Sequence, residues 1–224
     1  MGAYAPFFGT TLGAAAVLLM KNKINKTIHL ILNGFAAGVM VAASIWSLLI
    51  PSIEQSNSFI PAVVGFIIGI VFLLVINRRK SDLLVFSVTL HNIPEGMAVG
   101  AIFAAYLANS LSIMQAFIVS LGITIQNIPE GAIISMPLKI KGINKMKSFI
   151  YGMLSGLVEP IGALIMMLTL GYMLPLLPYL LSFAAGAMMY VVIKELLPEV
   201  STDKGIVFFT LGFCLMMALD VALG

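Results

Sequence analysis

Long apolar runs, separated by short polar segments, occupy almost the whole chain. Eight of these runs approach or exceed the length of about 20 mainly apolar residues that a membrane-crossing helix needs. The segments between them contain the proline, glycine, asparagine and charged residues that interrupt helices. The pattern therefore predicts an all-α polytopic membrane protein with eight transmembrane helices, at Ala5–Met20, Thr27–Ile50, Ile60–Ile76, Leu83–Leu107, Ser112–Leu138, Ser148–Met173, Leu176–Leu197 and Ile206–Leu223.

The amino-acid composition agrees with this pattern. Of the 224 residues, 61% are hydrophobic and 9% are charged, whereas a soluble domain carries about 25% charged residues. The lipid bilayer is therefore the expected solvent. The single cysteine, Cys214, lies in an apolar run, which argues against a disulfide framework or a thiolate metal site. The first apolar run precedes its lysines, the reverse of a signal peptide, so we expect it to be retained as a helix.

The basic residues predict the orientation in the membrane. All twelve lie in or beside the segments that follow the first, third, fifth and seventh predicted helices, which share one side of the membrane. Basic residues are enriched on the cytoplasmic side, so both termini are expected outside. A surface for nucleic acid is not expected, because topology explains each basic position: Lys21, Lys23, Lys26, Arg78, Arg79, Lys80, Lys139, Lys141, Lys145, Lys147, Lys194 and Lys204.

Two pairs of similar segments indicate an inverted repeat. "GFAAGVMVAASIWSLLIP" (Gly34–Pro51) returns 148 residues later as "SFAAGAMMYVVIKELLPE" (Ser182–Glu199), and "HNIPEG" (His91–Gly96) returns as "QNIPEG" (Gln126–Gly131). In each pair the two predicted helices run in opposite directions. Inverted repeats are common in secondary transporters, although small-residue packing surfaces can also arise independently. We expect three, two and three helices, with the outer groups related by inversion.

The hexads place polar side chains inside apolar helices. His91 and Glu95 are four residues apart, so they project from one helical face. Pro94 and Pro129 cannot donate a helical hydrogen bond, so we expect the helices to open at these positions, as also at Pro160. The alternative is two proline-kinked helices with a hydrogen-bonded His–Glu pair of structural importance only.

Three carboxylates reach similar depths on three consecutive predicted helices: Glu95, Glu130 and Glu159. Each ionised carboxylate at the bilayer centre costs at least about 2.5 kcal/mol. Because no lysine or arginine is predicted at that depth, protons or a bound cation must balance the charge. Imidazole with carboxylate suits zinc, iron, manganese or cadmium better than magnesium or calcium. The further ligands available here are His91, Asn92, Gln126 and Asn127.

With these motifs, and with "VEP" (Val158–Pro160) on the sixth helix, the chain resembles the ZIP (Zrt-/Irt-like) family of divalent-metal transporters. The likeness is greatest to the short prokaryotic GufA-like branch and covers essentially residues 1–224 as a single transmembrane domain. It implies a multi-pass protein of the prokaryotic cytoplasmic (plasma) membrane with extracytoplasmic termini. It also implies an elevator-like motion, in which helices one, four, five and six move against helices two, three, seven and eight.

The resemblance further implies one or two metal ions at the membrane midplane. Glu95 and Glu130 would bridge the two positions. An aspartate stands in some members where this chain has Asn127, so the second position is expected to bind more weakly or to stay empty. The first position is formed by His91, Glu95, Gln126 and Glu130 with Met40 as a weaker ligand, and the second by Asn92, Glu95, Asn127, Glu130 and Glu159.

Polar residues near the two membrane surfaces are candidates for the mouths of a pathway. We expect an outer entrance at Ser47, at Glu54 in the loop after the second helix, and at Asp220. The expected inner exit consists of His29, Glu195 and Glu199. Glu54, His29 and Glu199 have the alternative of being plain interfacial residues, and Glu195 has that of pairing with Lys194 or another inner lysine.

The sequence thus predicts import of Zn²⁺, or of Fe²⁺, Mn²⁺, Cd²⁺ or Co²⁺, into the cytoplasm by alternating exposure of the midplane site. The alternative is a proton-coupled carrier of another solute that uses the glutamates as a proton relay. An intramembrane protease is not expected, because the chain has neither an HExxH nor a GxGD motif. The small-residue faces are compatible with a homodimer, while the preferred metal and the driving force stay open.

Overall fold

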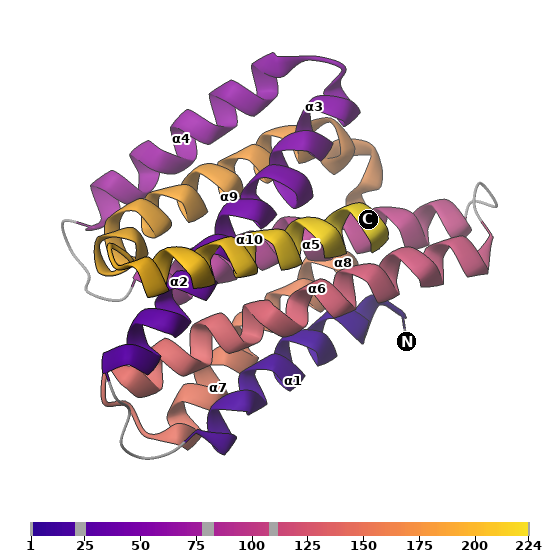
Figure 1. The fold of residues 1–224 in the computed structure, drawn as a ribbon. Helices are drawn as coiled ribbons and strands as arrows, with labels where there is room; N and C mark the ends of the chain where they lie inside the picture. Colours follow the sequence, from indigo (N-terminus) through magenta and orange to yellow (C-terminus); the bar gives the residue numbers. More distant parts are fainter. Residues whose placement is uncertain (1, 21–25, 78–82, 108–111, 224) are drawn as a thin grey trace.

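The computed structural model describes residues 2–20, 26–77, 83–107 and 112–223. Within these ranges every regular element is a helix, and Figure 1 shows the helices packed side by side in one bundle. The α-helices are α1 (Ala5–Leu19), α2 (Lys26–Ala43), α3 (Ile50–Ser56), α4 (Phe59–Asn77), α5 (Leu83–Leu107), α6 (Ile113–Ile140), α7 (Lys145–Gly156), α8 (Val158–Met173), α9 (Leu177–Val191) and α10 (Asp203–Leu223). Short 3-10 turns are η1 (Gly2–Tyr4), η3 (Leu174–Leu176) and η5 (Leu197–Glu199), and π-helical turns are η2 (Ser44–Leu49) and η4 (Val192–Leu196).

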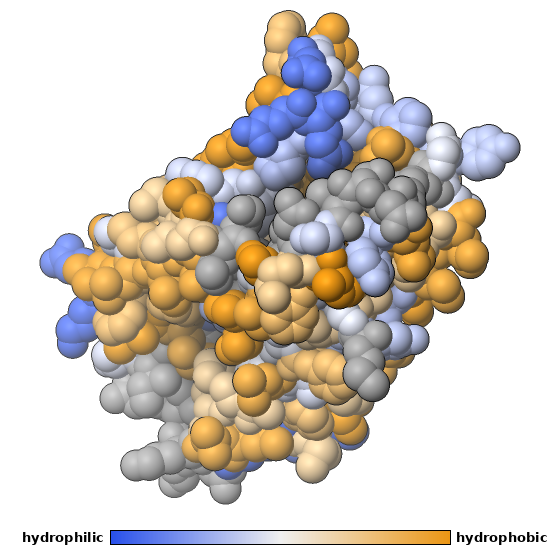
Figure 2. Space-filling view, turned by 90° about the vertical axis from the view of Figure 1, so that its right-hand side faces the viewer, coloured by the Kyte–Doolittle hydropathy of each residue, from blue (hydrophilic) through white to orange (hydrophobic). Residues whose placement is uncertain are grey.

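The helices have the length and composition of membrane spans. Six described stretches are long and apolar enough to cross a bilayer, and α4 adds a shorter apolar helix at Phe59–Val75. Large apolar side chains also cover the outside of the bundle, including Phe59, Ile67 and Val75 on α4. Figure 2 shows apolar residues spread over the middle of one face, with the hydrophilic residues gathered towards its edges. The chain is therefore an all-α membrane protein, as the sequence predicts.

The second predicted helix continues beyond its expected end at Ile50. The chain passes through the π-helical turn η2 and continues as α3, and it turns only at Asn57, whose φ is 49°. In η2 the N–H of Ile50 donates to the carbonyl of Ile45, five residues back. Because the backbone stays helical through Leu49 and Ile50, Pro51 lies inside a continuous helix, where its missing N–H leaves the carbonyl four residues earlier without that donor. The expectation that Glu54 lies in a loop is therefore wrong, because its exposed side chain lies on a helix.

The sixth predicted helix is divided into two. Helix α7 ends at Gly156 and α8 begins at Val158. Pro160 explains the break, because it has no N–H to donate to the carbonyl of Gly156. Helices α5 and α6 instead continue through Pro94 and Pro129. Of these three prolines, only Pro160 therefore lies at a break between two helices.

Two pairs of helices pack through glycine in matching ways. Helix α2 packs against α10, and α9 packs against α4. A Cβ added to Gly38 of α2 would meet the carbonyl oxygen of Phe209, and one added to Gly212 of α10 would meet that of Phe35. The second pair repeats this arrangement with Gly186 against Phe66 and Gly69 against Phe183. Small residues permit this close approach of backbones, which stabilises helix pairs in lipid.

The other two pairs also match, and they include the glycines of both hexads. Helix α1 packs against α6, and α8 packs against α5. A Cβ on Gly131 would meet the carbonyl oxygen of Thr10, and one on Gly96 would meet that of Glu159. The partner helices contribute glycines as well: Gly13 of α1 approaches the carbonyl of Ile128, and Gly162 of α8 approaches that of Ile93. The hexad glycines thus bring a neighbouring backbone close, as the sequence predicts.

Candidate metal site

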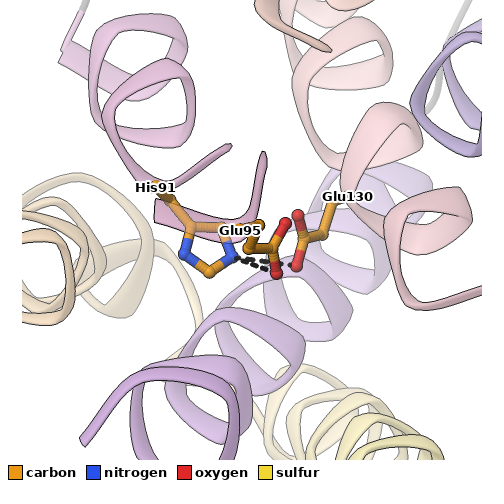
Figure 3. Close-up of side chains that lie close together, drawn as sticks. All are labelled: His91, Glu95 and Glu130. Atoms are coloured by element: carbon orange, nitrogen blue, oxygen red, sulfur yellow. Dashed lines mark hydrogen bonds and ion pairs between the residues drawn. The ribbon is translucent and has the colours of Figure 1, made fainter. Parts of the chain in front are cut away.

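The two hexads meet in the interior, where α5 contributes His91 and Glu95 and α6 contributes Glu130 (Figure 3). The Nε2 atom of His91 lies 3.2 Å from Oε1 of Glu95 and 3.1 Å from Oε1 of Glu130. One ligand atom from each of the three side chains lies within 4.8 Å of the other two. The one-turn spacing on α5 and the contact between α5 and α6 produce this convergence.

These three side chains are removed from solvent. His91 is 0% exposed, Glu95 is 5% exposed and Glu130 is 2% exposed. Among the described residues, the ion pairs of both glutamates are with His91 alone. Since a neutral histidine carries no charge and a protonated one carries a single charge, two ionised carboxylates would keep an excess of negative charge. A divalent cation could neutralise that excess.

Several buried polar atoms around the cluster have no hydrogen-bond partner among the described residues. A buried polar atom without a partner costs about 1–3 kcal/mol, so a group of them in one place requires an explanation. Carboxylate oxygen, amide oxygen and imidazole nitrogen together form a donor set that fits zinc and similar divalent ions. The atoms are Nδ1 of His91, Oδ1 of Asn92, Oε2 of Glu95, Oδ1 and Nδ2 of Asn127, Oε2 of Glu130 and Oε2 of Glu159.

Glu159 lies close to this cluster. It is 0% exposed, and it interacts electrostatically with both Glu95 and Glu130. It lies in the first turn of α8, directly after the break that follows Gly156. The break before α8 therefore places a carboxylate at a helix start. Nearby, Nδ2 of Asn92 donates to the carbonyl of Ser155 over 3.0 Å, which leaves the amide oxygen of Asn92 unused.

Two other predicted ligands, Met40 and Gln126, lie on α2 and α6. Met40 of α2 is buried, at 1% exposure, in the apolar core that α2 forms with α6, α9 and α10. Gln126 lies on α6 beside Asn127, but its side chain is outside the described part of the structure. The geometry therefore gathers His91, Glu95 and Glu130, with Glu159 close by.

Of the three residues of the predicted outer entrance, Ser47 and Asp220 are in contact, and Glu54 lies apart from them. The hydroxyl of Ser47 in η2 donates to Oδ1 of Asp220 in α10 over 2.5 Å. Asp220 is 7% exposed, and it interacts electrostatically with both Glu130 and Glu95. Asp220, held by Ser47, is thus near enough to the cluster to interact with its carboxylates. Glu54 is exposed on α3 instead.

The side chains of the predicted inner exit are outside the described part of the structure. Their backbones belong to α2 for His29, to η4 for Glu195 and to η5 for Glu199. Lys194, the partner considered for Glu195, donates to the hydroxyl of Tyr190 over 3.1 Å and lies 5.5 Å from the centre of its ring. The role of these acidic residues stays a prediction.

Thr10 is a residue at this site that the sequence analysis did not identify. It is 0% exposed on α1, and its hydroxyl donates to Oε1 of Glu159 over 2.6 Å. No motif in the sequence marks Thr10, because a single threonine in an apolar run gives no sign of a contact 149 residues away.

In a membrane protein, an imidazole and carboxylates gathered inside the helical bundle are typical of ion or proton pathways. Residues 78–220 match the model of the family described as ZIP Zinc transporter. The chain is 30% identical to the zinc transporter ZIP11 of Homo sapiens, over 100% of this chain and 96% of that protein. It is 32% identical to the zinc transporter ZIPB of Bordetella bronchiseptica, over 100% of this chain and 81% of that protein. It is also 40% identical to the zinc transporter GufA of Myxococcus xanthus, over 63% of this chain and 56% of that protein. The chain therefore belongs to the ZIP zinc transporter family, as its hexads predict.

Proposed function

We propose that the protein carries zinc, or a similar divalent transition-metal ion, across the membrane into the cytoplasm, and that the ion binds at His91, Glu95 and Glu130. The observation that carries this proposal is the convergence of three buried ligand atoms within 4.8 Å of one another. Membership of the ZIP family and the transport of zinc by the relatives, as their names state, support the same ion.

The site chemistry explains how an ion leaves water for this interior. Zinc accepts imidazole nitrogen and carboxylate oxygen at about 2.0–2.2 Å, usually with four ligands. Nε2 of His91 and one oxygen each of Glu95 and Glu130 supply three such ligands, and Gln126 or Met40 is available for a fourth. These atoms replace the hydration shell, while the ion balances the two carboxylates. The buried charges and the ion thus stabilise each other.

A second ion position is proposed beside the first. Glu159 and the amides of Asn92 and Asn127 supply its ligands, and Glu95 and Glu130 bridge to it. Support comes from the unpartnered oxygens Oε2 of Glu159 and Oδ1 of Asn92. Because Asn127 is neutral, this position attracts a cation less strongly than an aspartate there would. We therefore propose that the second ion binds more weakly than the first.

We also propose eight spans with both termini outside. The spans are α1, α2 with α3, α4, α5, α6, α7 with α8, α9 with η4, and α10. The matching glycine contacts support an inverted repeat, because α1–α6 corresponds to α8–α5, and α2–α10 corresponds to α9–α4. The π-helical turns agree, since η2 begins at Ser44 and η4 begins at Val192, which is 148 residues later.

The glycine contacts further support two rigid units. Each helical glycine that approaches the backbone of another helix does so within one of two sets: α1, α5, α6, α7 and α8, or α2, α4, α9 and α10. Between the sets, α2 and α6 border an apolar cavity of about 170 Å³ lined by residues such as Leu32 and Met136. We propose that the first set carries the ion and slides against the second, which exposes the site to each side in turn.

The decisive experiment measures zinc uptake into proteoliposomes that contain a zinc-sensitive fluorophore. Glu130→Gln keeps the size of the side chain and removes a charged ligand, so we expect the initial rate to fall at least about tenfold. Asp203→Asn, at an exposed position in the first turn of α10, is the matched control and is expected to behave as the unmodified protein. An unchanged rate for Glu130→Gln would remove the proposed site, and proton-driven uptake of another solute without zinc would favour the alternative carrier.

A further inference from the structure

Thr10 makes one dominant hydrogen bond, and its acceptor is a proposed metal ligand. Its Oγ1 lies 2.6 Å from Oε1 of Glu159 and 3.4 Å from the carbonyl oxygen of Pro6. A hydroxyl has one proton, and the nearer acceptor is the carboxylate. A separation of 2.5–2.7 Å is typical of a hydroxyl that donates to an ionised carboxylate. The contact therefore holds one oxygen of the Glu159 carboxylate in place.

The surrounding backbone is shaped around this contact. Helix α7 ends at Gly156, and a Cβ at that position would lie 2.8 Å from Cβ of Thr10 and 3.1 Å from Oε1 of Glu159. A Cβ at Gly131 would meet the carbonyl oxygen of Thr10 itself. Two glycines, one on α6 and one at the break before α8, thus let α1 place Thr10 against Glu159. The contact depends on three helices meeting closely.

The hydrogen bond also makes the two oxygens of Glu159 inequivalent. Oε1 accepts from Thr10, whereas Oε2 has no hydrogen-bond partner among the described residues. A carboxylate held at one oxygen loses most of its freedom to rotate before an ion arrives. The entropy cost of ordering it is then met during folding, so less of it falls on ion binding.

From this geometry we propose that Thr10 is a positioning residue for metal binding. Its hydroxyl orients and stabilises the Glu159 carboxylate, which then offers Oε2 to the ion. The proposal rests on the proposed function, because it takes Glu159 as a ligand of the second ion position. It assigns a role in ion affinity to α1, a helix of the proposed moving unit that has no predicted ligand.

The test is zinc binding to the purified protein, measured by isothermal titration calorimetry. Thr10→Val preserves the shape of the side chain and removes the hydroxyl, and we expect affinity at the weaker position to fall about tenfold. Thr10→Ala and Thr10→Ser form a second pair. Both variants lack the methyl group of threonine, and only Thr10→Ser keeps the hydroxyl. Ala should lose affinity as Val does, and Ser should stay within about twofold of the unmodified protein. Thr11→Val is the matched control, because the Thr11 hydroxyl has no hydrogen-bond partner among the described residues.

A double-mutant cycle separates orientation of Glu159 from general packing. In a Glu159→Gln background, Thr10→Val should weaken zinc binding no further. The proposal is overturned if Val and Ala bind zinc as tightly as Thr, if Ser fails as Ala does, or if the loss persists in full in the Glu159→Gln background. If the Val variant does not fold, the Ala and Ser pair decides. Absence of zinc binding by the unmodified protein would instead contradict the proposed function.

Discussion

At the scale of single residues, Asn127 limits the charge that the interior must hold. Its amide is 0% exposed and lies near enough to the Glu159 carboxylate to interact with it, although no described residue meets full hydrogen-bond geometry with its oxygen or nitrogen. Glu95, Glu130 and Glu159 already interact electrostatically with one another nearby. A fourth carboxylate would add like-charge repulsion whenever no ion is bound. The amide offers an oxygen ligand without that cost.

We therefore expect Asn127→Asp to strengthen ion binding at the proposed second position. The added carboxylate should raise zinc affinity there about tenfold, because one further negative charge faces the cation at close range. The same variant should unfold at a lower temperature without zinc and recover when zinc is added. Calorimetry and thermal unfolding measure the two effects. Asn144→Asp is the control, since Asn144 caps α7 and aspartate caps a helix equally well. A binding isotherm identical to that of the unmodified protein would contradict this expectation.

At the scale of helices, hydropathy predicts where helices occur better than it predicts the residues at which they end. The apolar runs locate the helices because a backbone in lipid must satisfy its own hydrogen bonds. Pro51 misled the prediction because a π-helical turn precedes it, and Pro160 divided a run that was predicted as one helix. Whether a proline ends a helix depends on its neighbours in space, which a hydropathy pattern does not contain.

Close packing between helices supplies a test at this scale. Gly131→Ala would place a methyl group on the carbonyl oxygen of Thr10, so α1 must move away from α6. We expect a loss of about 1–3 kcal/mol in the free energy of unfolding, the usual cost of overpacking. Gly171→Ala is the control, because a Cβ there meets nothing within 4 Å. Thermal unfolding in detergent compares the two, and equal stability of both variants would show that α1 and α6 are not packed this closely.

At the scale of the whole molecule, the arrangement of close contacts separates the bundle into two sets of helices. Glycine-mediated backbone contacts join the helices within each set, whereas α2 and α6 of different sets border an apolar cavity. Interlocked backbones resist sliding, so we propose that relative motion of the two units takes place at the boundary between the sets rather than within either set.

Cross-linking tests this motion directly, in a background with Cys214 replaced by serine. A short bifunctional thiol reagent between Leu32→Cys on α2 and Met136→Cys on α6 should arrest zinc uptake, because it ties the two sets together. The control pair is Leu18→Cys on α1 and Lys145→Cys on α7, within one set, where Nζ of Lys145 lies 3.2 Å from the carbonyl oxygen of Leu18. Full uptake by the cross-linked α2–α6 protein would contradict the sliding of one set against the other.

The sequence by itself determined the membrane class, the helical runs and the candidate ligands of the hexads. It did so because hydropathy is a local property and because charged groups in hydrocarbon are costly enough to identify themselves. The convergence of His91, Glu95 and Glu130 could be expected from the one-turn spacing on α5 and the repeat of the hexad on α6.

Only the tertiary structure decided which distant side chains meet. Thr10 pairs with Glu159 across 149 residues, and Ser47 pairs with Asp220 across 173 residues. The break before α8 and the glycines Gly131 and Gly156 set the first of these contacts. In lipid, apolar surfaces attract one another no more than they attract the solvent, so helix pairing follows from close fit and from hydrogen bonds between helices. That fit is a property of two surfaces together, and it arises only when the helices are packed.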